Sequence, residues 1–350
     1  MARRLDGTRR TSRALAPQAA AARHRSRSAA RRGHARGIAQ AAGYLTFHVG
    51  KWHLGDGAHA PETQGFDLNI GGTHWGAPNT FFWPFNGSNT FRDFRYVPGL
   101  GVGRPGDYLT DRLTDEAIKL VDAAGGRPFF LNLWFHNPHT PIEGKPDLVE
   151  RYRAKLKPGM NHQNPEYAAM IHTLDENVGR LLAHLDRRGL SRRTLVVFTS
   201  DNGGYVGEFK GARVTDNTPL RSGKGSLYEG GIRVPLIARL PGLTPAGAVC
   251  DAPVQCMDYF PTLAELAGAG AESASDGRSI ATLLRNPPRG FPTRRAVLPL
   301  SPLLRHDVTR QRHARRRLET AGVPRGPTHR TLQPDVRPRG RPERGRRISA

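Results

Sequence analysis

Lysine is missing from both ends of this 350-residue chain, although its formal net charge is +23. Residues 1–37 contain 11 Arg, no Lys and one acid, which gives a net charge of +10. Residues 286–350 contain 17 Arg, no Lys and four acids, which gives +13. Residues 38–285 hold 25 basic and 25 acidic side chains and are neutral. The charge therefore belongs to the two ends, and the middle gives no reason to expect a specific nucleic acid partner.

Apolar runs are also scarce in the two ends, which are rich in Arg, Ala, Pro and Gly. Such segments cannot bury enough surface to offset chain entropy, so we expect residues 1–37 and 286–350 to be largely disordered around a folded portion at 38–285. One interpretation is that the arginine-rich arms bind polyanions. We favour the other, in which GC-rich DNA has been translated in a wrong frame or from a wrong start, because a selected basic arm normally uses Lys as well as Arg.

Long hydrophobic stretches and cysteines are few as well. No stretch approaches the roughly 20 apolar residues of a transmembrane helix, so we expect no membrane span. The N-terminal segment has no apolar core that suits a secretory signal, although its Arg, Ala and Ser content also suits an organelle transit peptide, and the localisation stays open. Cys250 and Cys256 lie in CDAPVQC, which has no metal-binding spacing, and we expect them to be small buried hydrophobic residues.

The most informative stretch begins with LVVF at residues 195–198. Continuous apolar character without alternation predicts a strand that is covered on both faces. The strand ends at Asp201 and Asn202, whose oxygens suit a divalent cation at the carboxyl end of a strand. Lys224 lies between two glycines about twenty residues later, where the backbone can approach an anion closely. We expect a metal site and an anion site at one sheet edge.

Residues 43–49, GYLTFHV, predict a second strand, because they are rich in aromatic and β-branched side chains. Lys51 and His53 follow it, with glycines on both sides that let the turn pass close to a ligand. The alternative is a surface turn with a solvated lysine and a packed Trp52.

Residues 128–135, PFFLNLWF, predict a third strand, which ends at HNPHTP. Two histidines three residues apart resemble part of a zinc site, but the prolines exclude a regular helix and the chain has no HExxH motif. A proton donor or an oxyanion contact at His136 is the better functional interpretation, against a histidine packed in a proline-rich turn.

Helical periodicity completes an α/β pattern. A strand, helix, strand unit from 129 to 199 should be parallel and right-handed. Its helix begins at Asn164, which can cap it, and Asp258 can cap a later helix. Residues 56–105 are loop-rich, and they either shape a pocket or form a structural insertion. The expected helices are 107–124, 164–189 and 258–266, and a further strand is expected at 234–239.

Four motifs in this order resemble the sulfatases of the alkaline-phosphatase-like superfamily: GYLTFHVGKWHLG, FFLNLWFHNPHTP, TSDNGG and GKGSLYEGGIRVP. The resemblance covers about residues 38–285 and implies an α/β sandwich with a mostly parallel central sheet flanked by helices. It implies that Asp201 and Asn202 ligate calcium. It also implies that four residues surround a sulfate ester, namely Lys51, His53, His136 and Lys224.

The chemistry of sulfate ester hydrolysis needs these residue types. Negative charge grows on the bridging oxygen as the S–O bond breaks, so cations must neutralise the group and a donor must protonate the leaving alcohol. In the family, calcium and two lysines do the first. A histidine that resembles His136 and a lysine that resembles Lys224 assist the second. A histidine matched by His53 helps the nucleophile, a formylglycine made from the Cys or Ser of a C/S-x-P-x-R motif, to shed its sulfate.

The chain departs from the family at the nucleophile. It contains no C/S-x-P-x-R motif, so formylglycine is absent, and it contains no Asp-Asp pair. Both belong to the family's amino-terminal strand and nucleophile helix, so we expect an N-terminally truncated fragment. Asp201 and Asn202 supply at most three oxygens, fewer than the six to eight that calcium prefers, so we expect weak calcium binding. We also expect impaired hydrolysis.

The expected substrate is a sulfated small molecule or glycan, and the sequence does not distinguish between them. Two alternatives stay open. One is a phosphoester hydrolase or transferase of the same superfamily. The other is a non-catalytic protein that binds polyanions through its arginine-rich tails.

Overall fold

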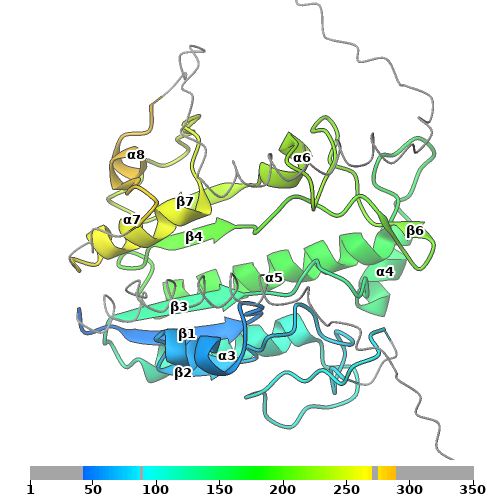
Figure 1. Cartoon of the computed structure of the whole chain (residues 1–350), viewed down its shortest axis with the longest axis horizontal. Coiled ribbons are helices and arrows are strands. Elements are labelled where there is room, and N and C mark those ends of the chain that lie inside the picture. The colour runs from blue at the N-terminus through cyan, green and yellow to red at the C-terminus, as the bar shows by residue number, and fades with distance from the viewer. Residues whose placement is uncertain (1–41, 87–89, 270–274, 289–350) are drawn as a thin grey trace, which may run out of the picture. The chain divides into compact units, whose positions relative to one another are not determined.

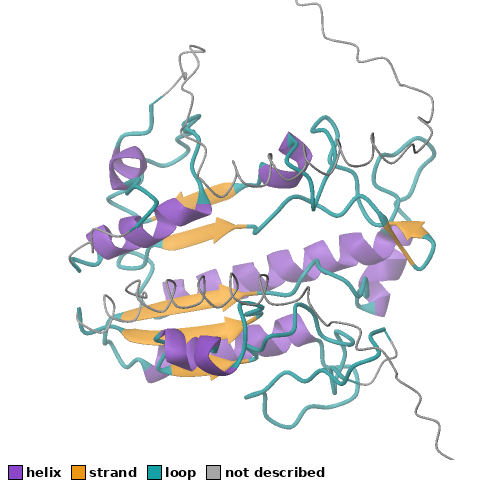
Figure 2. Cartoon of the chain, viewed as in Figure 1, coloured by secondary structure: helices purple, strands orange, loops and turns teal. Residues whose placement is uncertain are grey.

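The computed structural model describes residues 42–86, 90–269 and 275–288. The described part is α/β, as expected, with strands and helices that alternate along most of its length (Figure 2). Segment 1–37 and nearly all of segment 286–350, for which we predicted disorder, lie outside the described residues, as does most of the helix end predicted near 38–42. The division into 1–37, 38–285 and 286–350 stays a prediction.

A three-stranded parallel sheet forms the first layer (Figure 1). Its central strand β1 (Leu45–Gly50) pairs on one side with β3 (Phe129–Trp134) and on the other with β2 (Leu68–Ile70). The strands predicted at 43–49 and 128–135 are thus confirmed. The three-residue β2 was not predicted, because it is too short for its pattern to stand out from the loop-rich segment around it.

A two-stranded antiparallel sheet joins β4 (Val196–Thr199) to β7 (Leu236–Arg239). Both strands were predicted, but the parallel unit from 129 to 199 was not found, since β3 and β4 are not hydrogen-bonded in the described part of the chain. The handedness rule applies only to strands of one sheet, and here the intervening helix connects two sheets. Val197 is 39% exposed, so the expectation that this strand is covered on both faces was also wrong.

The helices confirm most of the expected periodicity. Asn164 caps the longest one as predicted, because its side-chain oxygen accepts a hydrogen bond of 3.1 Å from the backbone N–H of Tyr167. Asp258 does not cap its helix, because its carboxylate accepts backbone N–H groups of Gln255 and Arg278 instead. The described helices are α3 (Leu109–Ala123), α4 (Pro146–Arg153), α5 (Pro165–Arg187), α6 (Glu229–Ile232), α7 (Tyr259–Leu266) and α8 (Ala281–Arg285).

Short elements complete the described chain. None of its helices is long and apolar enough to cross a membrane. The remaining elements are the 3₁₀ turns η1 (Gly57–His59), η2 (Pro61–Gln64) and η3 (Cys256–Asp258), and the hairpin strands β5 (Glu208–Phe209) and β6 (Ala212–Arg213).

Both cysteines are exposed, which contradicts the expectation that they are buried. Cys250 and Cys256 belong to the connection between β7 and α7. Connections run over the protein surface, where backbone polar groups can reach water. The position of the segment therefore outweighs the usual preference of cysteine for the interior.

The main core includes residues of β1, α3 and the loop-rich segment after β2. Val49 and Leu113 are fully buried. Phe81 and Phe85 come from the loop-rich segment and join the same core, which shows that part of 56–105 has a structural role. Tyr108 is also buried there, and its hydroxyl donates a hydrogen bond of 2.8 Å to the backbone oxygen of Glu143.

The buried stripe of α5 differs from the apolar face that helical spacing in the sequence predicts, which includes Met170, Ile171 and Leu185. Met170 and Leu185 are buried as expected, but Ile171 is 41% exposed. Thr173 and Asn177 are buried in its place. The stripe is rotated because α5 packs against α3 through polar side chains, which a count of apolar residues at helical spacing does not detect.

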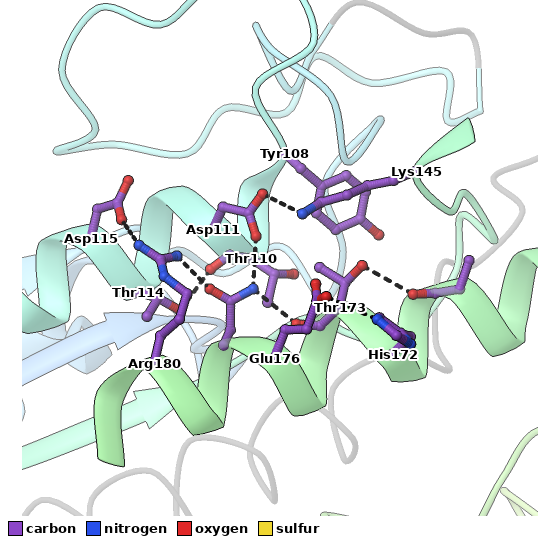
Figure 3. Close-up of polar contacts among 12 residues, drawn as sticks. Tyr108, Thr110, Asp111, Thr114, Asp115, Lys145, His172, Thr173, Glu176 and Arg180 are labelled. Carbon is purple, nitrogen blue, oxygen red and sulfur yellow. Dashed lines mark hydrogen bonds and ion pairs between the residues drawn. The ribbon is translucent and has the colours of Figure 1, made fainter. Parts of the chain in front are cut away.

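Asn177 is the centre of that polar contact. Figure 3 shows the charged side chains that the contact includes, Asp111 and Asp115 of α3 and Arg180 of α5. Its amide nitrogen donates a hydrogen bond of 2.7 Å to Asp111 of α3, and its oxygen accepts one of 2.8 Å from Arg180. Asp111 also forms an ion pair of 2.7 Å with Lys145, just before α4. Arg180 reaches a second α3 carboxylate, Asp115, at the exposed end of the contact. The network fixes α3, α5 and the start of α4 against one another.

We predict that Asn177→Ala lowers the free energy of unfolding by about 2–3 kcal/mol, because it leaves buried hydrogen-bonding groups without partners. Asp115→Ala removes an exposed ion pair from the same helix contact and should cost less than about 1 kcal/mol. Urea unfolding of both variants beside the unchanged chain measures the difference. Equal losses in the two variants would contradict a central role for Asn177.

Candidate functional site

Lys51 lies directly after β1 and stays attached to β3. Its backbone N–H donates a hydrogen bond of 2.7 Å to the oxygen of Trp134, the last residue of β3. Gly50 has a φ of +102°, and a Cβ there would lie 2.1 Å from the same oxygen. Only glycine fits this close approach. The glycine that we took as a sign of a ligand turn therefore also lets the two strand ends meet.

His53 is held in a strained conformation beside a second loop. Its φ is +57°, which non-glycine residues rarely adopt, and its backbone N–H donates a hydrogen bond of 2.9 Å to Thr73. A Cβ on Gly76 would lie 2.5 Å from the imidazole Cε1 of His53. The loop after β2 therefore packs against the ring of His53, while the residue as a whole stays exposed.

The cations of these loops affect one another. Burial lowers the pKa of the Lys51 ammonium, and Lys224 lowers it further, while Asp201 raises it. Burial also lowers the pKa of His53, followed by Lys51, Lys224 and Arg95, again with Asp201 in opposition. The structure thus brings residues from three distant sequence motifs within electrostatic reach. Since these cations outnumber the single carboxylate that acts on them, the arrangement suits an anion.

The turn after β3 contains two histidines in different surroundings. His136 is 6% exposed, and its Nδ1 has no hydrogen-bond partner. Burial lowers the pKa of His136 to about 3, with further lowering by Lys51. His139 is only partly buried, and burial lowers its pKa to about 4. Lys51 and Lys224 lower the pKa of His139 and Asp201 raises it, so His139 faces the same charges as His53.

Asn137 anchors this turn to the helices. Its side-chain oxygen accepts a hydrogen bond of 2.7 Å from Thr110 of α3, and its amide donates one of 3.0 Å to the backbone oxygen of Met170 in α5. The side chain is 7% exposed, so both bonds are shielded from water. His139 is oriented by its own neighbour, since its Nδ1–H donates to the backbone oxygen of Thr140 at 2.9 Å. Its Nε2 is then left for a ligand.

The loop that carries Lys224 packs against the end of the TSDNGG motif through backbone atoms. The backbone N–H of Lys224 donates to Gly204 at 3.0 Å, and that of Gly203 donates to Gly231 at 2.9 Å. A Cβ on Gly203 would lie 1.8 Å from the oxygen of Gly230. The glycines of the two motifs are therefore needed for their contact with each other, which fixes Lys224 relative to Asp201.

Asn217 holds the same two motifs together and was missed in the sequence. Its side-chain nitrogen lies 2.9 Å from the oxygen of Gly204, 3.0 Å from that of Ser222 and 3.1 Å from that of Gly230. The signal available in the sequence was an asparagine in a turn with Thr218 and Pro219. That signal predicts a turn, and it does not show which distant carbonyls the amide will reach.

His48 lies on β1 and is fully buried. Its Nδ1 lies 3.1 Å from the side-chain nitrogen of Asn132 on β3, and its Nε2 lies 3.2 Å from the oxygen of Gly50. A neutral ring protonated at Nε2 satisfies both bonds, because it accepts from the amide and donates to the carbonyl. Burial accordingly lowers the pKa of His48 to about 4.

Comparison with known proteins identifies the family of this site. The family model described as Sulfatase matches residues 37–269. The chain belongs to the sulfatase family. A sulfatase of Formosa agariphila is 39% identical over 203 residues, which are 54% of this chain and 35% of that protein. Mouse steryl-sulfatase is 41% identical over 189 residues, which are 52% of this chain and 29% of that protein. The chain spans about a third of the length of these curated relatives.

Solved sulfatase structures share the fold. The crystal structure of Ps i-CgsB in complex with k-i-k-neocarrahexaose has a TM-score of 0.61 and 33% sequence identity, and the match covers 71% of this chain and 56% of that chain. The alkaline-phosphatase-like α/β fold that the motifs implied is thereby confirmed. The described residues form a sulfatase-type scaffold with two sheets and their connecting helices.

The resemblance implied that Asp201 and Asn202 are metal ligands in this sulfatase chain. Asp201 is exposed, and the side-chain amide of Asn202 donates to the oxygen of Gly203 at 3.0 Å. No group of three or more His, Cys, Asp or Glu side chains within 42–86, 90–269 and 275–288 is arranged to hold a metal ion. These donors alone do not fit calcium, which needs six to eight oxygens. The calcium role of the two residues stays a prediction.

Buried histidines predict that this sulfatase fold loses stability in mild acid. The pKa of His48 is about 4 and that of His136 about 3 in the folded protein, against 6.5 for an ordinary histidine. Below about pH 6.5 the unfolded chain therefore binds protons that the folded chain does not, and the free energy of unfolding falls with falling pH. Each such histidine contributes a loss of about 1.4 kcal/mol per pH unit until its folded-state pKa is reached.

Urea unfolding at pH 7.5 and pH 5.5 measures this loss. His48→Gln keeps a donor and an acceptor in the side chain but cannot titrate, so its loss between the two pH values should be smaller by about 1.4 kcal/mol. The comparison uses the pH dependence within each protein, so any general destabilisation by the substitution cancels. The same pH dependence in both proteins would show that His48 is not buried as a neutral ring.

Proposed function

We propose that this sulfatase-family chain binds the sulfate monoester of a sugar, as part of a domain that hydrolyses such esters. One observation carries the proposal. Lys51, His53, His139 and Lys224 come from three separate motifs, and the charges of the two lysines act on each other and on both histidines, with the carboxylate of Asp201 in opposition. Because like charges held close together are unfavourable, an anion between them would be bound favourably.

Each side chain has a role that its surroundings support. The ammonium groups of Lys51 and Lys224 would neutralise the sulfate and the negative charge that develops on the bridging oxygen. Lys224 comes from a loop fixed by backbone hydrogen bonds, so little reorganisation is needed when the ester binds. His53 lies next to both cations and would contact a further sulfate oxygen.

His139 is the better candidate for proton transfer to the leaving alcohol, although the motif led us to expect His136. His139 is partly exposed and is acted on by the charges of Lys51, Lys224 and Asp201, whereas His136 is buried. The Nδ1–H of His139 donates to the oxygen of Thr140, and this bond fixes the orientation of the ring and of its Nε2. A bound sulfate would raise the pKa of His139 by stabilising the imidazolium, so binding would also prepare the donor.

A saccharide is the class of substrate that the solved relative supports, whereas steryl-sulfatases are among the curated relatives. The solved relative at 33% identity binds k-i-k-neocarrahexaose, an oligosaccharide. The relatives also include proteins called N-acetylgalactosamine-6-sulfatase, of which the dog protein is 32% identical over 247 residues. These names support a sulfated sugar as the ligand class, and they leave its linkage and sulfate position to experiment.

Binding and turnover should separate in this chain. The sequence has no C/S-x-P-x-R motif, so it has no formylglycine to attack sulfur, and the described residues contain no group of three or more His, Cys, Asp or Glu side chains that could hold a metal ion. We predict that the purified 350-residue chain hydrolyses 4-nitrophenyl sulfate at the background rate. The release of 4-nitrophenol measures this rate. Turnover well above background that Lys224→Ala abolishes would overturn this prediction and would require a different nucleophile.

Binding itself tests the proposed site. We predict that N-acetylglucosamine 6-sulfate binds the chain and that Lys224→Ala weakens the dissociation constant at least tenfold, about 1.4 kcal/mol, because one of the two ammonium groups is lost. Lys210→Ala removes the same charge from an exposed position of the β5–β6 hairpin and should leave the affinity unchanged. Isothermal titration calorimetry measures both variants.

The matched phosphate ester distinguishes the two hydrolase classes. Titration with N-acetylglucosamine 6-phosphate under the same conditions should give weaker binding than the sulfate. Clearly tighter binding of the phosphate would favour the phosphoester alternative. Equal effects of Lys224→Ala and Lys210→Ala would instead indicate nonspecific attraction to a cationic protein, and would reject this site.

A further inference from the structure

Arg95 has a fixed side chain in the loop-rich segment after β2. Its guanidinium carbon lies 3.5 Å from the ring centre of Phe91 and 5.5 Å from that of Trp75. The side chain is 16% exposed. Cation–π contact with two aromatic rings and extensive burial restrict the rotamers of this long side chain, so a ligand that binds it meets a group that is already ordered.

Two of the three guanidinium nitrogens of Arg95 are used within the protein. Nε lies 3.3 Å from both carboxylate oxygens of Asp93, and Nη1 donates to the backbone oxygen of Ala77 at 3.2 Å. Nη2 has no acceptor in the described part of the chain, and this nitrogen is not buried. Arg95 therefore has one nitrogen, with two N–H donors, available to a ligand beside the loop.

The structure places Arg95 beside the candidate sulfate site through one short segment. Trp75, Gly76 and Ala77 are consecutive: the first packs under the guanidinium and the third accepts its Nη1–H. Gly76, between them, is the residue whose Cβ would meet the ring of His53 at 2.5 Å. The charge of Arg95 accordingly contributes to lowering the pKa of His53. The segment from Trp75 to Ala77 thus contacts both Arg95 and His53.

A purely structural role does not explain why the Arg95 guanidinium is fixed in place with one nitrogen unpaired among the described residues. Its partner Asp93 is 45% exposed, and exposed ion pairs of this kind contribute little to stability. The carboxylate does hold the guanidinium plane in place. It occupies the Nε side, however, and does not occupy Nη2, where an incoming anion would bind. A guanidinium that is held at Nε and Nη1 and accessible at Nη2 is arranged to bind an anion.

We propose that Arg95 forms a second anion subsite, in which Nη2 binds an acidic substituent of the sugar whose sulfate ester lies between Lys51, His53 and Lys224. The inference rests on the proposed function and adds the substrate class, a sugar that carries a second sulfate or a carboxylate within reach of the first. Charge-assisted hydrogen bonds of guanidinium to such groups are strong, so this contact selects doubly acidic sugars over singly sulfated ones.

Calorimetry with two probes tests the subsite in the full chain. The probes are N-acetylglucosamine 6-sulfate, with one acidic group, and glucosamine 2-N,6-O-disulfate, with two. We expect the unchanged chain to bind the disulfate about tenfold more tightly. Arg95→Gln should remove this preference while the chain still binds the monosulfate. Arg92→Gln removes an equal charge from an exposed position three residues earlier and should keep the preference.

The outcomes distinguish this subsite from the sulfate site. Equal affinity of the unchanged chain for both probes overturns the subsite and leaves the proposed function intact. Loss of the preference in both arginine variants also overturns it, since general electrostatic attraction then explains the effect. Binding of neither probe rejects the proposed function and the subsite together. If Arg95→Gln does not fold, Arg95→Lys retains the charge without the fork, and it should lose most of the preference while the monosulfate still binds.

Discussion

The parallel pairing of β1 with β3 is the constraint on which the candidate site depends. Six residue pairs run in register from Leu45 with Phe129 to Gly50 with Trp134. Because parallel strands end at the same edge, this register delivers Lys51 and the histidine turn after Trp134 to one place. The hydrogen bond from Lys51 to Trp134 extends the pairing by one residue beyond β1, so a slip of one residue would move the cation away from the turn.

The second half of the site depends on contacts between glycines and carbonyl groups. The loop of Lys224 and the end of the TSDNGG motif meet backbone to backbone, with Asn217 between them. Side chains at these glycines would separate the two motifs, so their sequence is restricted by packing as well as by any ligand. These backbone contacts hold Lys224 within electrostatic reach of Lys51 despite the repulsion between two ammonium groups.

The sequence patterns predicted the elements better than their partners. β1, β3, α3 and α5 followed from local periodicity and from a capping residue, Asn164, whose effect reaches only a few residues. Pairing is a tertiary property, and the patterns of the two apolar strands 129–134 and 196–199 could not show that they belong to different sheets. The polar stripe of α5 was missed for the same reason, since Asn177 is buried against a carboxylate that α3 supplies, while the buried Thr173 hydroxyl bonds the backbone oxygen of Ala169 in its own helix.

The candidate site residues divide in a similar way. Lys51, His53 and Lys224 follow strands or lie between glycines, and those local signs placed them near one another, as the structure does. Arg95 carried no such sign, because its importance comes from Trp75 and Ala77, about twenty residues earlier in the chain. The choice between His136 and His139 also required burial, which a turn of alternating prolines and histidines does not reveal.

The proposed site would bind an ester without necessarily accelerating its hydrolysis. Contacts that stabilise the bound ester and the transition state equally raise affinity and leave the barrier unchanged. Lys51 and Arg95 would act on anionic groups that are already present in the ground state, so much of their effect is of this kind. In the proposed site, Lys224 and His139 would lie at the bridging oxygen and the leaving alcohol. They would act on charge that develops only when a nucleophile attacks sulfur and the bond breaks. In a chain without that nucleophile, binding assays should therefore reveal the roles of Lys51, Arg95, Lys224 and His139 better than turnover assays do.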